Sequence, residues 1–295
     1  MADLAAIITE IELATGDNCQ PFTSHSIGGG CINSAYRLDT PAGQFFVKVN
    51  RPDLSDMFAA EALGLQEMAA IEAVRVPTVI CHGRTASDSF LVLEYIPLGG
   101  LRGQAAGLLG EQLAKLHAAG QPYFGWSMDN TIGSTPQPND RQNDWVSFWQ
   151  EQRLAHQYNL AARHGFAGQL QKNGEKLIEQ VPAFFSDHQP QPSLLHGDLW
   201  GGNAAADDNG QPVIFDPACY YGDAEADLAM TELFGGFGGD FFAAYRNVRP
   251  IDSGYRVRKT LYNLYHILNH LNLFGGGYLG QAESMTQQLL SEVKG

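Results

Sequence analysis

The pattern of hydrophobic and polar positions predicts a first third of the chain in which short strands alternate with two helices. Apolar residues recur at helical spacing over residues 3–14 and again over 55–72. Other short apolar runs are separated by glycine and proline turns, as is typical of strands. The predicted strands cover two runs on either side of the glycines at 28–30, then residues 44–50, 77–81 and 89–94.

The remainder of the chain is predicted to be mainly helical. The segments with helical spacing are 104–119, 142–164, 167–180, 255–274, 281–293 and one that begins near Asp223. The first part ends where a strand runs into Pro97 and a glycine pair, which is typical of a hinge. We therefore expect an α+β protein with one domain over residues 1–96 and a second over 97–295.

Length and charge narrow the classes of protein. At 295 residues, the chain is long enough for two domains with a sizeable core. Hydrophobic residues make up 44% of it and charged residues 17%, which indicates a folded globular protein. The formal net charge of -14 argues against nucleic acid or an anionic membrane as the main partner, because either needs a basic surface. The same charge is compatible with a positively charged substrate.

No apolar run is long enough to span a bilayer, and the acidic N-terminal segment is unlike a signal peptide. We therefore expect a cytoplasmic protein. The four cysteines are scattered and form no CxxC pair, so neither a disulfide framework nor a zinc site is predicted.

The clearest chemical pattern lies in the stretch 195–203 (LHGDLWGGN), followed by 213–217 (VIFDP). An acid at Asp198, an amide at Asn203 and a second acid at Asp216 match the phosphoryl-transfer pattern of a base and two metal ligands. A carboxylate can orient the attacking hydroxyl and accept its proton, and Mg2+ prefers hard oxygen ligands. We therefore predict Asp198 as the catalytic base and Asn203 and Asp216 as ligands of Mg2+.

The turn at 207–210 (DDNG) between two apolar runs predicts a β-hairpin that brings Asn203 and Asp216 side by side. Taken separately, the two pieces have a simpler interpretation. His196 and its neighbours can form a capped turn, and Asp216 with Pro217 can be an ordinary strand exit. The spacing and the hairpin together favour the phosphoryl-transfer site, with His196 as structural support of the catalytic loop.

Two features of the first domain suit the phosphates of ATP. Gly28, Gly29 and Gly30 let a backbone approach phosphates closely, although three glycines can also be a plain hairpin turn. Lys48 lies in an apolar strand, and Glu61 lies on the helix that follows it. A strand lysine paired with a helix glutamate is the kinase arrangement for binding the α- and β-phosphates. The alternative is a strand-end lysine that reaches solvent.

The predicted hinge offers an adenine site. Glu94, Tyr95 and Ile96 end the strand that leads into it. Their backbone groups could hydrogen-bond the adenine of ATP before the chain enters the second domain.

The segment after Asp216 is too short for the activation segment of a protein kinase. Gly222 follows six residues later, and a helix is predicted to begin near Asp223. A small-molecule kinase fits better. Asp223 and Glu225 either cap this helix through its dipole or face a cationic substrate amine. Asp227 is predicted to support the backbone of the catalytic loop.

The connection at 121–140 is long for a segment without secondary structure, and such loops are often functional. Trp126, Asp129 and Asn130 can border a substrate there. Alternatively, the aromatic residues anchor an ordered loop.

Together these motifs resemble the fructosamine kinase family, also called ketosamine-3-kinases, whose protein-kinase-like fold includes aminoglycoside phosphotransferases and choline kinases. The resemblance spans nearly the whole chain and is carried by 28–33 (GGGCIN), 46–48 (FVK), 93–95 (LEY), 124–133 (FGWSMDNTIG), 195–203 (LHGDLWGGN) and 216–223 (DPACYYGD). The tryptophan after HGDL and the cysteine after the glycines distinguish this family from its relatives. The resemblance implies a two-lobed fold. A nucleotide-binding lobe holds an antiparallel sheet and one key helix, and a larger helical lobe carries the catalytic and substrate residues.

The resemblance also implies an activity. The family transfers the γ-phosphoryl group of ATP to the 3-hydroxyl of a ketosamine, a sugar adduct of a free amine or of a protein lysine, which leads to deglycation. Trp200 becomes a candidate platform for the sugar, with packing of the catalytic loop as its alternative. Cys31 stands where some members are redox-sensitive and bridge two subunits. A monomer or a Cys31-linked homodimer is therefore expected.

Three other functions fit parts of the pattern. An aminoglycoside- or choline-type phosphotransferase would use the same scaffold, but Trp200 and Cys31 disfavour it. A non-catalytic nucleotide-binding regulator is disfavoured because the predicted nucleotide and metal residues are all present. Hydrolysis by a metal bound to His196, Asp198 and Asp216 lacks a further cluster of ligands.

Overall fold

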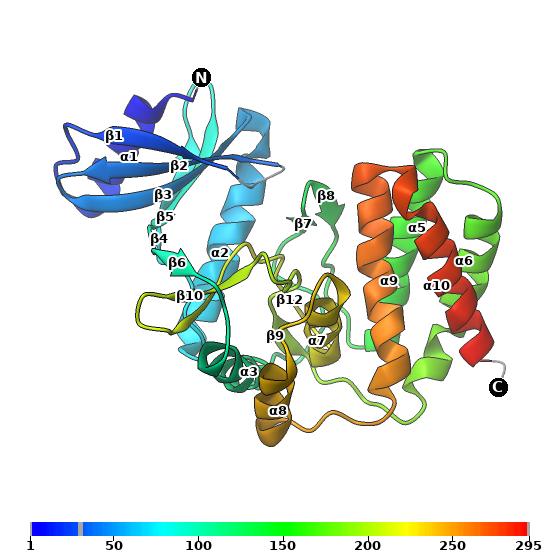
Figure 1. Ribbon diagram of the computed structural model, residues 1–295. Helices are drawn as coiled ribbons and strands as arrows, with labels where there is room; N and C mark the ends of the chain where they lie inside the picture. Colours follow the sequence, from blue (N-terminus) through cyan, green and yellow to red (C-terminus); the bar gives the residue numbers. More distant parts are fainter. Residues whose placement is uncertain (1, 29–31, 294–295) are drawn as a thin grey trace. The chain divides into compact units, whose positions relative to one another are not determined.

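The structure of the chain, a computed structural model, describes residues 2–28 and 32–293 (Figure 1). The predicted phosphate-binding residues Gly29 and Gly30 and the predicted redox residue Cys31 lie outside the described residues. In the part of the chain that is described, no helix is both long and apolar enough to cross a membrane.

The chain forms two compact units, each described by itself below. Unit 1 takes in residues 1–101 and 204–217. Unit 2 takes in residues 102–203 and 218–295. A single stretch from the middle of the sequence therefore completes the packing of the N-terminal unit.

Unit 1 is built around a five-stranded antiparallel sheet with the strand order β1-β2-β3-β5-β4, as the resemblance implies. In chain order, β1 to β5 cover Thr23–Ile27, Ser34–Thr40, Gly43–Asn50, Val79–Arg84 and Ser89–Glu94. β4 begins two residues later than the sequence predicts. Pro77 has no N–H for a strand ladder, and the N–H of Thr78 is bound by the carboxylate of Glu94 at 3.2 Å.

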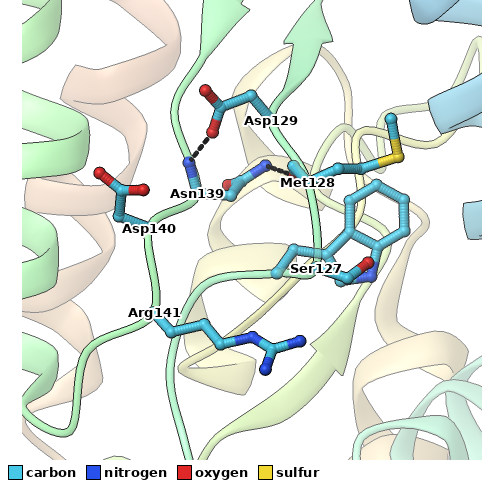
Figure 2. Close-up of a pocket in the computed structure, with 7 residues that line it drawn as sticks. Ser127, Met128, Asp129, Asn139, Asp140 and Arg141 are labelled. Carbon is cyan, nitrogen blue, oxygen red and sulfur yellow. Dashed lines mark hydrogen bonds between the residues drawn. The ribbon is translucent and has the colours of Figure 1, made fainter.

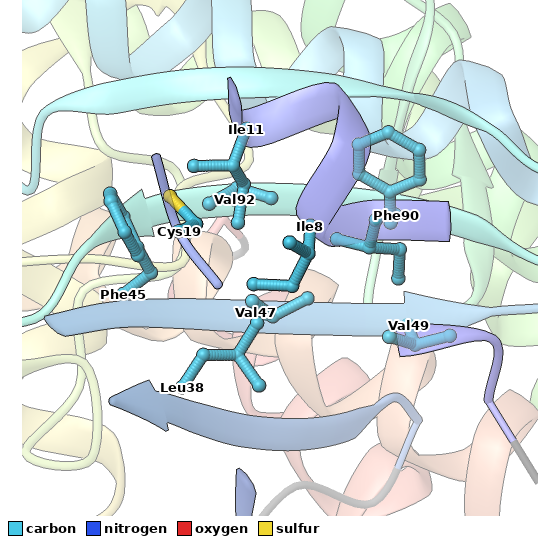
Figure 3. Packing of buried hydrophobic residues seen from close by; sticks show 10 residues of the cluster. Ile8, Ile11, Cys19, Leu38, Phe45, Val47, Val49, Phe90 and Val92 are labelled. Carbon is cyan, nitrogen blue, oxygen red and sulfur yellow. The ribbon is translucent and has the colours of Figure 1, made fainter. Parts of the chain in front are cut away.

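The alternation of side chains along β3 separates the two faces of this sheet. Val47 packs in a buried cluster with Ile8 of α1 (Leu4–Thr15), and Figure 3 shows this cluster between the helix and the strands. Lys48, the next residue, points to the opposite face and reaches α2 (Ser55–Ile71). The two helices therefore cover opposite faces, and only one face is wholly apolar.

Unit 1 also holds a small second sheet. Its strands are β6 (Leu98–Gly99), β10 (Ala204–Asp207) and β11 (Pro212–Ile214), in the order β11-β10-β6. β10 and β11 pair antiparallel, which confirms the predicted hairpin. Arg75 forms an ion pair with the buried Asp207 of this hairpin. The hairpin is thereby tied to the N-terminal part of the chain.

Unit 2 is mainly helical. Its α-helices are α3 (Gln104–Leu116), α4 (Trp145–Phe148), α5 (His156–Arg163), α6 (Gln169–Gln180), α7 (Ala224–Leu233), α8 (Gly239–Val248), α9 (Tyr255–Phe274) and α10 (Leu279–Glu292). The long α9 packs against α5, α7 and α10 (Figure 1). Its Tyr262 meets Trp149 edge-to-face, with ring centroids 4.8 Å apart. α9 is therefore the central helix of this unit.

Two pairs of short strands complete unit 2. β9 (Ser193–Leu195) pairs with β12 (Tyr220–Gly222), and β7 (Asn130–Ile132) pairs with β8 (Thr135–Gln137). The segment 121–140, expected to be a long loop, therefore contains a hairpin of its own.

The single helix predicted over 142–164 is interrupted. Between α4 and α5 the chain forms a π-helix over Trp149–Ala155. Trp149, Arg153 and Gln157 are all buried and recur at every fourth residue. These three residues lie on one face and turn it toward the core.

Candidate active site

Lys48 forms two ion pairs inside unit 1. Its Nζ lies 2.6 Å from Oε1 of Glu61 and 2.5 Å from Oδ1 of Asp216. Lys48 is only 5% exposed. Burial opposes its charge, but the carboxylates of Asp216 and Glu61 raise the pKa of Lys48 above its ordinary value. The lysine therefore stays charged, and the pairing with Glu61 that the sequence predicts is present.

Asp216 has an unusual backbone. Its φ is 59°, in the left-handed region that residues other than glycine rarely adopt, and Pro217 follows it. Strain of this kind is common at functional sites. The side chain of Asp216 is 46% exposed although it is bonded to Lys48. Part of this side chain therefore faces solvent.

The predicted adenine-binding residues end strand β5 and continue beyond it. The carboxylate of Glu94 accepts hydrogen bonds from Arg75 and Thr78. The ring of Tyr95 lies beside the guanidinium of Arg37, 5.6 Å from its centroid. The carboxylate of Glu94 is therefore held by residues of its own unit.

In unit 2, Asp227 supports the turn that carries Asp198. Its carboxylate accepts the backbone N–H of His196 at 2.7 Å and that of Gly197 at 2.8 Å, as the sequence predicts for Asp227. Asp227 also faces Nε2 of the buried His117 at 3.2 Å. Burial alone would raise the pKa of Asp227, but the His117 hydrogen bond and the backbone N–H groups lower it, so the carboxylate is charged.

Ala218 contacts the other side of the same turn. The N–H of Ala218 donates to the carbonyl of His196 at 2.8 Å. Gly197 has a φ of 81°, and a Cβ added there would lie 2.1 Å from the carbonyl oxygen of Ala218. Only glycine fits this position. The backbone before Asp198 is thus enclosed from two sides.

Asn203 fixes the carboxylate of Asp198. Its Nδ2 donates to the backbone oxygen of Asp198 at 2.9 Å and to Oδ2 at 3.2 Å. Since the amide nitrogen is directed at Asp198, the amide oxygen is the atom that Asn203 can offer to a metal. Asn203 directly precedes strand β10, and Asp216 follows strand β11 by two residues. Amide and carboxylate oxygens are the donor set that Mg2+ prefers.

Trp200 lies two residues beyond Asp198 and is 39% exposed. A Cβ added to Gly202 would lie 2.3 Å from the ring of Trp200. The ring therefore rests against the glycine backbone and leaves part of its surface to solvent.

The side chains of Asp223 and Glu225 are both engaged by other residues of unit 2. In the β9–β12 pair, Gly222 lies opposite Ser193, at the end of β9 remote from the catalytic turn. Asp223 caps α7 by accepting the N–H of Glu225 at 3.1 Å, so the capping interpretation is confirmed.

The side chain of Glu225 is occupied by an ion pair. Its two oxygens bind the buried guanidinium of Arg258 at 2.7 and 2.9 Å. His188, Glu225 and Asp252 are the one group of described residues whose acidic and histidine side chains gather closely enough to suit a metal. Arg258 also bonds Asp252, at 2.6 Å, and so supplies positive charge there already. These contacts favour a structural role for Glu225 over contact with a substrate amine.

A hollow of about 430 Å³ opens beside the segment 126–141. Figure 2 shows the side chains that line it, with Asp129 accepting the backbone N–H of Asn139. Trp126 is only 3% exposed and lines this hollow from within the fold. Asn130 instead donates to the carbonyl of Cys219 at 2.8 Å.

Three further buried residues support these segments. They are His117 beside Asp227, and Asn139 and Arg153 behind the hairpin β7–β8. Asn139 and Arg153 stand among other polar residues, in 136–143 (PQPNDRQN) and 149–153 (WQEQR), a pattern that is typical of a surface position. The sequence therefore holds no local signal that these two are buried.

Solved structures define the class of the fold. A ternary complex of the aminoglycoside phosphotransferase APH(2")-IIa with streptomycin and ATP superposes with a TM-score of 0.64 at 15% identity, over 98% of this chain and 97% of that one. The chain therefore has the kinase-like fold of these phosphotransferases.

Sequence comparison defines the family. The fructosamine kinase family matches residues 4–292, and the chain belongs to this family. It is 48% identical over 285 residues to a proposed ketoamine kinase of Synechocystis, covering 96% of each chain. It is 45% identical over 290 residues to the chloroplastic protein-ribulosamine 3-kinase of Arabidopsis thaliana, covering 97% of this chain and 88% of that one.

A solved structure supports the same assignment. The proposed fructosamine-3-kinase of Thermobifida fusca superposes with a TM-score of 0.87 at 31% identity, over 97% of this chain and 99% of that one. The resemblance noted in the sequence is confirmed. The protein is an enzyme of the kinase class, with ATP as the phosphoryl donor.

Proposed function

We propose that this enzyme transfers the γ-phosphoryl group of ATP to the 3-hydroxyl of a ketosamine. The observation that carries the proposal is the fixed carboxylate of Asp198, bonded by Asn203 on a turn that Asp227 supports. It occurs in a chain that is 48% identical to a proposed ketoamine kinase over nearly its whole length. Phosphorylation at this hydroxyl destabilises the sugar adduct and so leads to deglycation of the amine.

In this proposal Asp198 orients the attacking hydroxyl and accepts its proton late, because phosphoryl transfer passes through a loose transition state. Asn203 and Asp216 would hold Mg2+, for which their oxygen atoms are suitable ligands. When bound, the ion neutralises negative charge on the phosphates. Trp200 offers its exposed ring to the C–H face of the sugar.

The nucleotide is assigned to unit 1. Lys48 carries a fixed positive charge that suits the α- and β-phosphates, and Glu61 orients it. The backbone from Glu94 to Ile96 is proposed to bond adenine. Gly28 ends the described part of the glycine segment, and a Cβ there would meet no atom within 4 Å. This open space supports close approach by a phosphate.

The test is ADP release by the purified enzyme with ATP and Mg2+. Ribulose- and fructose-derived lysine adducts are compared with choline and an aminoglycoside. We expect turnover on a ketosamine that Asp198→Asn abolishes and that Asp208→Asn, a control in the exposed turn of the hairpin, leaves unchanged. Turnover confined to choline or the aminoglycoside would overturn the proposed substrate but not the kinase assignment.

We also propose that Cys31 can link two subunits under oxidising conditions. The proposal rests on the position of this cysteine directly after the glycines of the resemblance motif. Non-reducing electrophoresis and size-exclusion chromatography after oxidant treatment should show a dimer that dithiothreitol reverses. The dimer should be absent from Cys31→Ser and retained in Cys81→Ser. An oxidised Cys31→Ser protein that still forms the dimer contradicts the proposal.

A further inference from the structure

Arg153 is a buried cation to which its sequence neighbour and its partners Pro138 and Asn139 offer only neutral oxygen atoms. It is 0% exposed, and no carboxylate forms an ion pair with it among the residues that the structure describes. Its guanidinium lies 4.6 Å from the ring centroid of Phe148 and 4.1 Å from that of Tyr220. Aromatic faces offset only part of the cost of burying a charge. An apolar side chain would cost less free energy to bury at this position, so the buried charge needs an explanation.

The guanidinium fixes the direction of a neighbouring amide. It donates to the carbonyl of Pro138 at 2.6 Å and to Oδ1 of Asn139 at 2.7 Å. An arginine can only donate, so the oxygen of Asn139 must face it and the nitrogen must face away. That nitrogen donates to the carbonyl of Met128, as Figure 2 shows, and to Oδ1 of Asn130 at 2.9 Å.

The amide groups of Asn130 and Gln137 are oriented in the same sense. Because Oδ1 of Asn130 accepts from Asn139, its Nδ2 points away and donates to the carbonyl of Cys219 at 2.8 Å. Gln137 donates to Asn130 at 2.8 Å and to the carbonyl of Ala218 at 3.1 Å. Each amide thus turns its N–H groups toward the backbone at 218–219.

This backbone segment borders the catalytic turn. The N–H of Ala218 donates to the carbonyl of His196. The carbonyl oxygen of Ala218 packs against Gly197. Asp198 is the next residue of the turn. A directed series of hydrogen bonds therefore runs from Arg153 to the backbone that determines where Asp198 lies.

We propose that Arg153 is a positioning residue for Asp198, acting through Asn139, Asn130 and Gln137. Its role is to be a side chain that only donates, so that Asn139 takes one orientation and directs its N–H groups at Asn130. Asn130 and Gln137 then donate to the carbonyls of Cys219 and Ala218. Without Arg153, Asn139 can flip and present its oxygen to Oδ1 of Asn130, which favours a flip of Asn130 that places an oxygen against the carbonyl of Cys219. The inference rests on the proposed function, since Asp198 is its target.

The decisive variant replaces one amide N–H donor by an oxygen acceptor in a side chain of nearly the same shape. Asn130→Asp places a carboxylate oxygen against the carbonyl of Cys219, where the two repel. We expect kcat to fall by about ten- to a hundredfold, the range for small displacements of a catalytic group, while KM for ATP stays within about twofold. The new carboxyl becomes a donor again when it is protonated. Activity relative to the parent should therefore recover as pH is lowered from about 8 to 5.

Arg153→Lys is the second variant. Lysine keeps the charge but lacks the planar fork that reaches Pro138 and Asn139 together. We expect a loss of kcat as well, without recovery at low pH. Asn143→Asp, the same chemical change at an exposed position nearby, is the matched control and should match the parent at every pH.

A kcat for Asn130→Asp within twofold of the parent would overturn the inference. So would a loss that follows the folded fraction measured by circular dichroism and shows no recovery at low pH. The parent is assayed first on ketosamines. If it accepts none, the variants are compared by whatever ADP release Asp198→Asn abolishes, so that the substrate proposal fails and the positioning role is still tested.

Discussion

Oδ1 of Asp227 accepts the backbone N–H of Gly197 at 2.8 Å, so a residue of helix α7 determines the turn before Asp198. Its other oxygen accepts the N–H of His196. We predict that Asp227→Asn replaces one of these acceptors by an amide N–H, which repels the backbone donor. Unfolding in urea should show a loss of about 2–4 kcal/mol, and kcat should fall more than KM for ATP.

The matched control for this prediction is Asp187→Asn, which removes a charge from an exposed position in the same unit. It should leave both quantities at the parent values. If Asp227→Asn keeps the parent kcat, the turn does not depend on the carboxylate.

A second prediction concerns Lys48 and Glu61. Lys48→Met leaves the carboxylate of Glu61, whose side chain is 10% exposed, without its main cation. Removing one member of a buried pair typically costs about 3–5 kcal/mol. Adding Glu61→Gln should restore much of this stability, because the uncompensated charge is gone. Activity should stay at least about a hundredfold below the parent in both variants.

Chemical denaturation and ADP release distinguish the two effects. Recovery of activity in the double variant would show that Lys48 supports the fold and does not bind phosphate. Arg51→Met, which removes an exposed cation from the same segment, is the control.

A third prediction follows from the close approach of Gly197 to Ala218. Gly197→Ala combines an unfavourable positive φ with a contact of 2.1 Å to backbone, which cannot be relieved by a rotamer change. Gly165→Ala has a similar φ of 90° but no atom within 4 Å. The first variant should lose at least about 3 kcal/mol and nearly all activity, and the second about 1–2 kcal/mol without loss of kcat. Equal losses in thermal unfolding would contradict the steric argument.

A fourth prediction concerns the pH dependence of stability. Nε2 of His188 lies 2.8 Å from Asp223, and Nδ1 lies 3.0 Å from Asp252. Glu225 and Arg258 are the other charged groups that face it. Burial would lower the pKa of His188, but the hydrogen bond and charge of Asp223 raise it above its ordinary 6.5.

A histidine whose pKa is raised in the folded state contributes stability that is complete below about pH 6.5 and declines as pH rises through the folded value. The parent should therefore lose urea stability above pH 6.5, and His188→Gln should show a flatter profile there. His164→Gln, at an exposed position, should keep the slope of the parent. Parallel profiles for the parent and His188→Gln would contradict this assignment.

The features that the sequence predicts are those with a local or periodic signal. The hairpin of β10 and β11 follows from a turn motif between two apolar runs, and the support of the turn by Asp227 follows from the motif. Lys48 is conspicuous because a charge in an apolar strand needs a partner. Such signals can be seen in the residue types and their spacing alone.

The features that escape prediction depend on partners far apart in the sequence. Arg153 bonds Asn139 from 14 residues away, and His117 meets Asp227 from 110 residues away. The interruption of the helix over 142–164 escapes prediction too. Trp149 and Arg153 are both buried within this π-helical segment, and nothing in their helix propensity marks it.

The return of the chain to unit 1 has a consequence for synthesis. Residues 204–217 form two strands of that unit, and Asp216 supplies a partner of Lys48. On the ribosome, unit 1 can therefore reach its final packing only after Pro217 has emerged, when residues 102–203 have already been made. Until then, Lys48 lacks its partner Asp216, and the small sheet lacks its hairpin. The N-terminal unit is thus the first to be synthesised, but it cannot be complete until a large part of unit 2 has also been made.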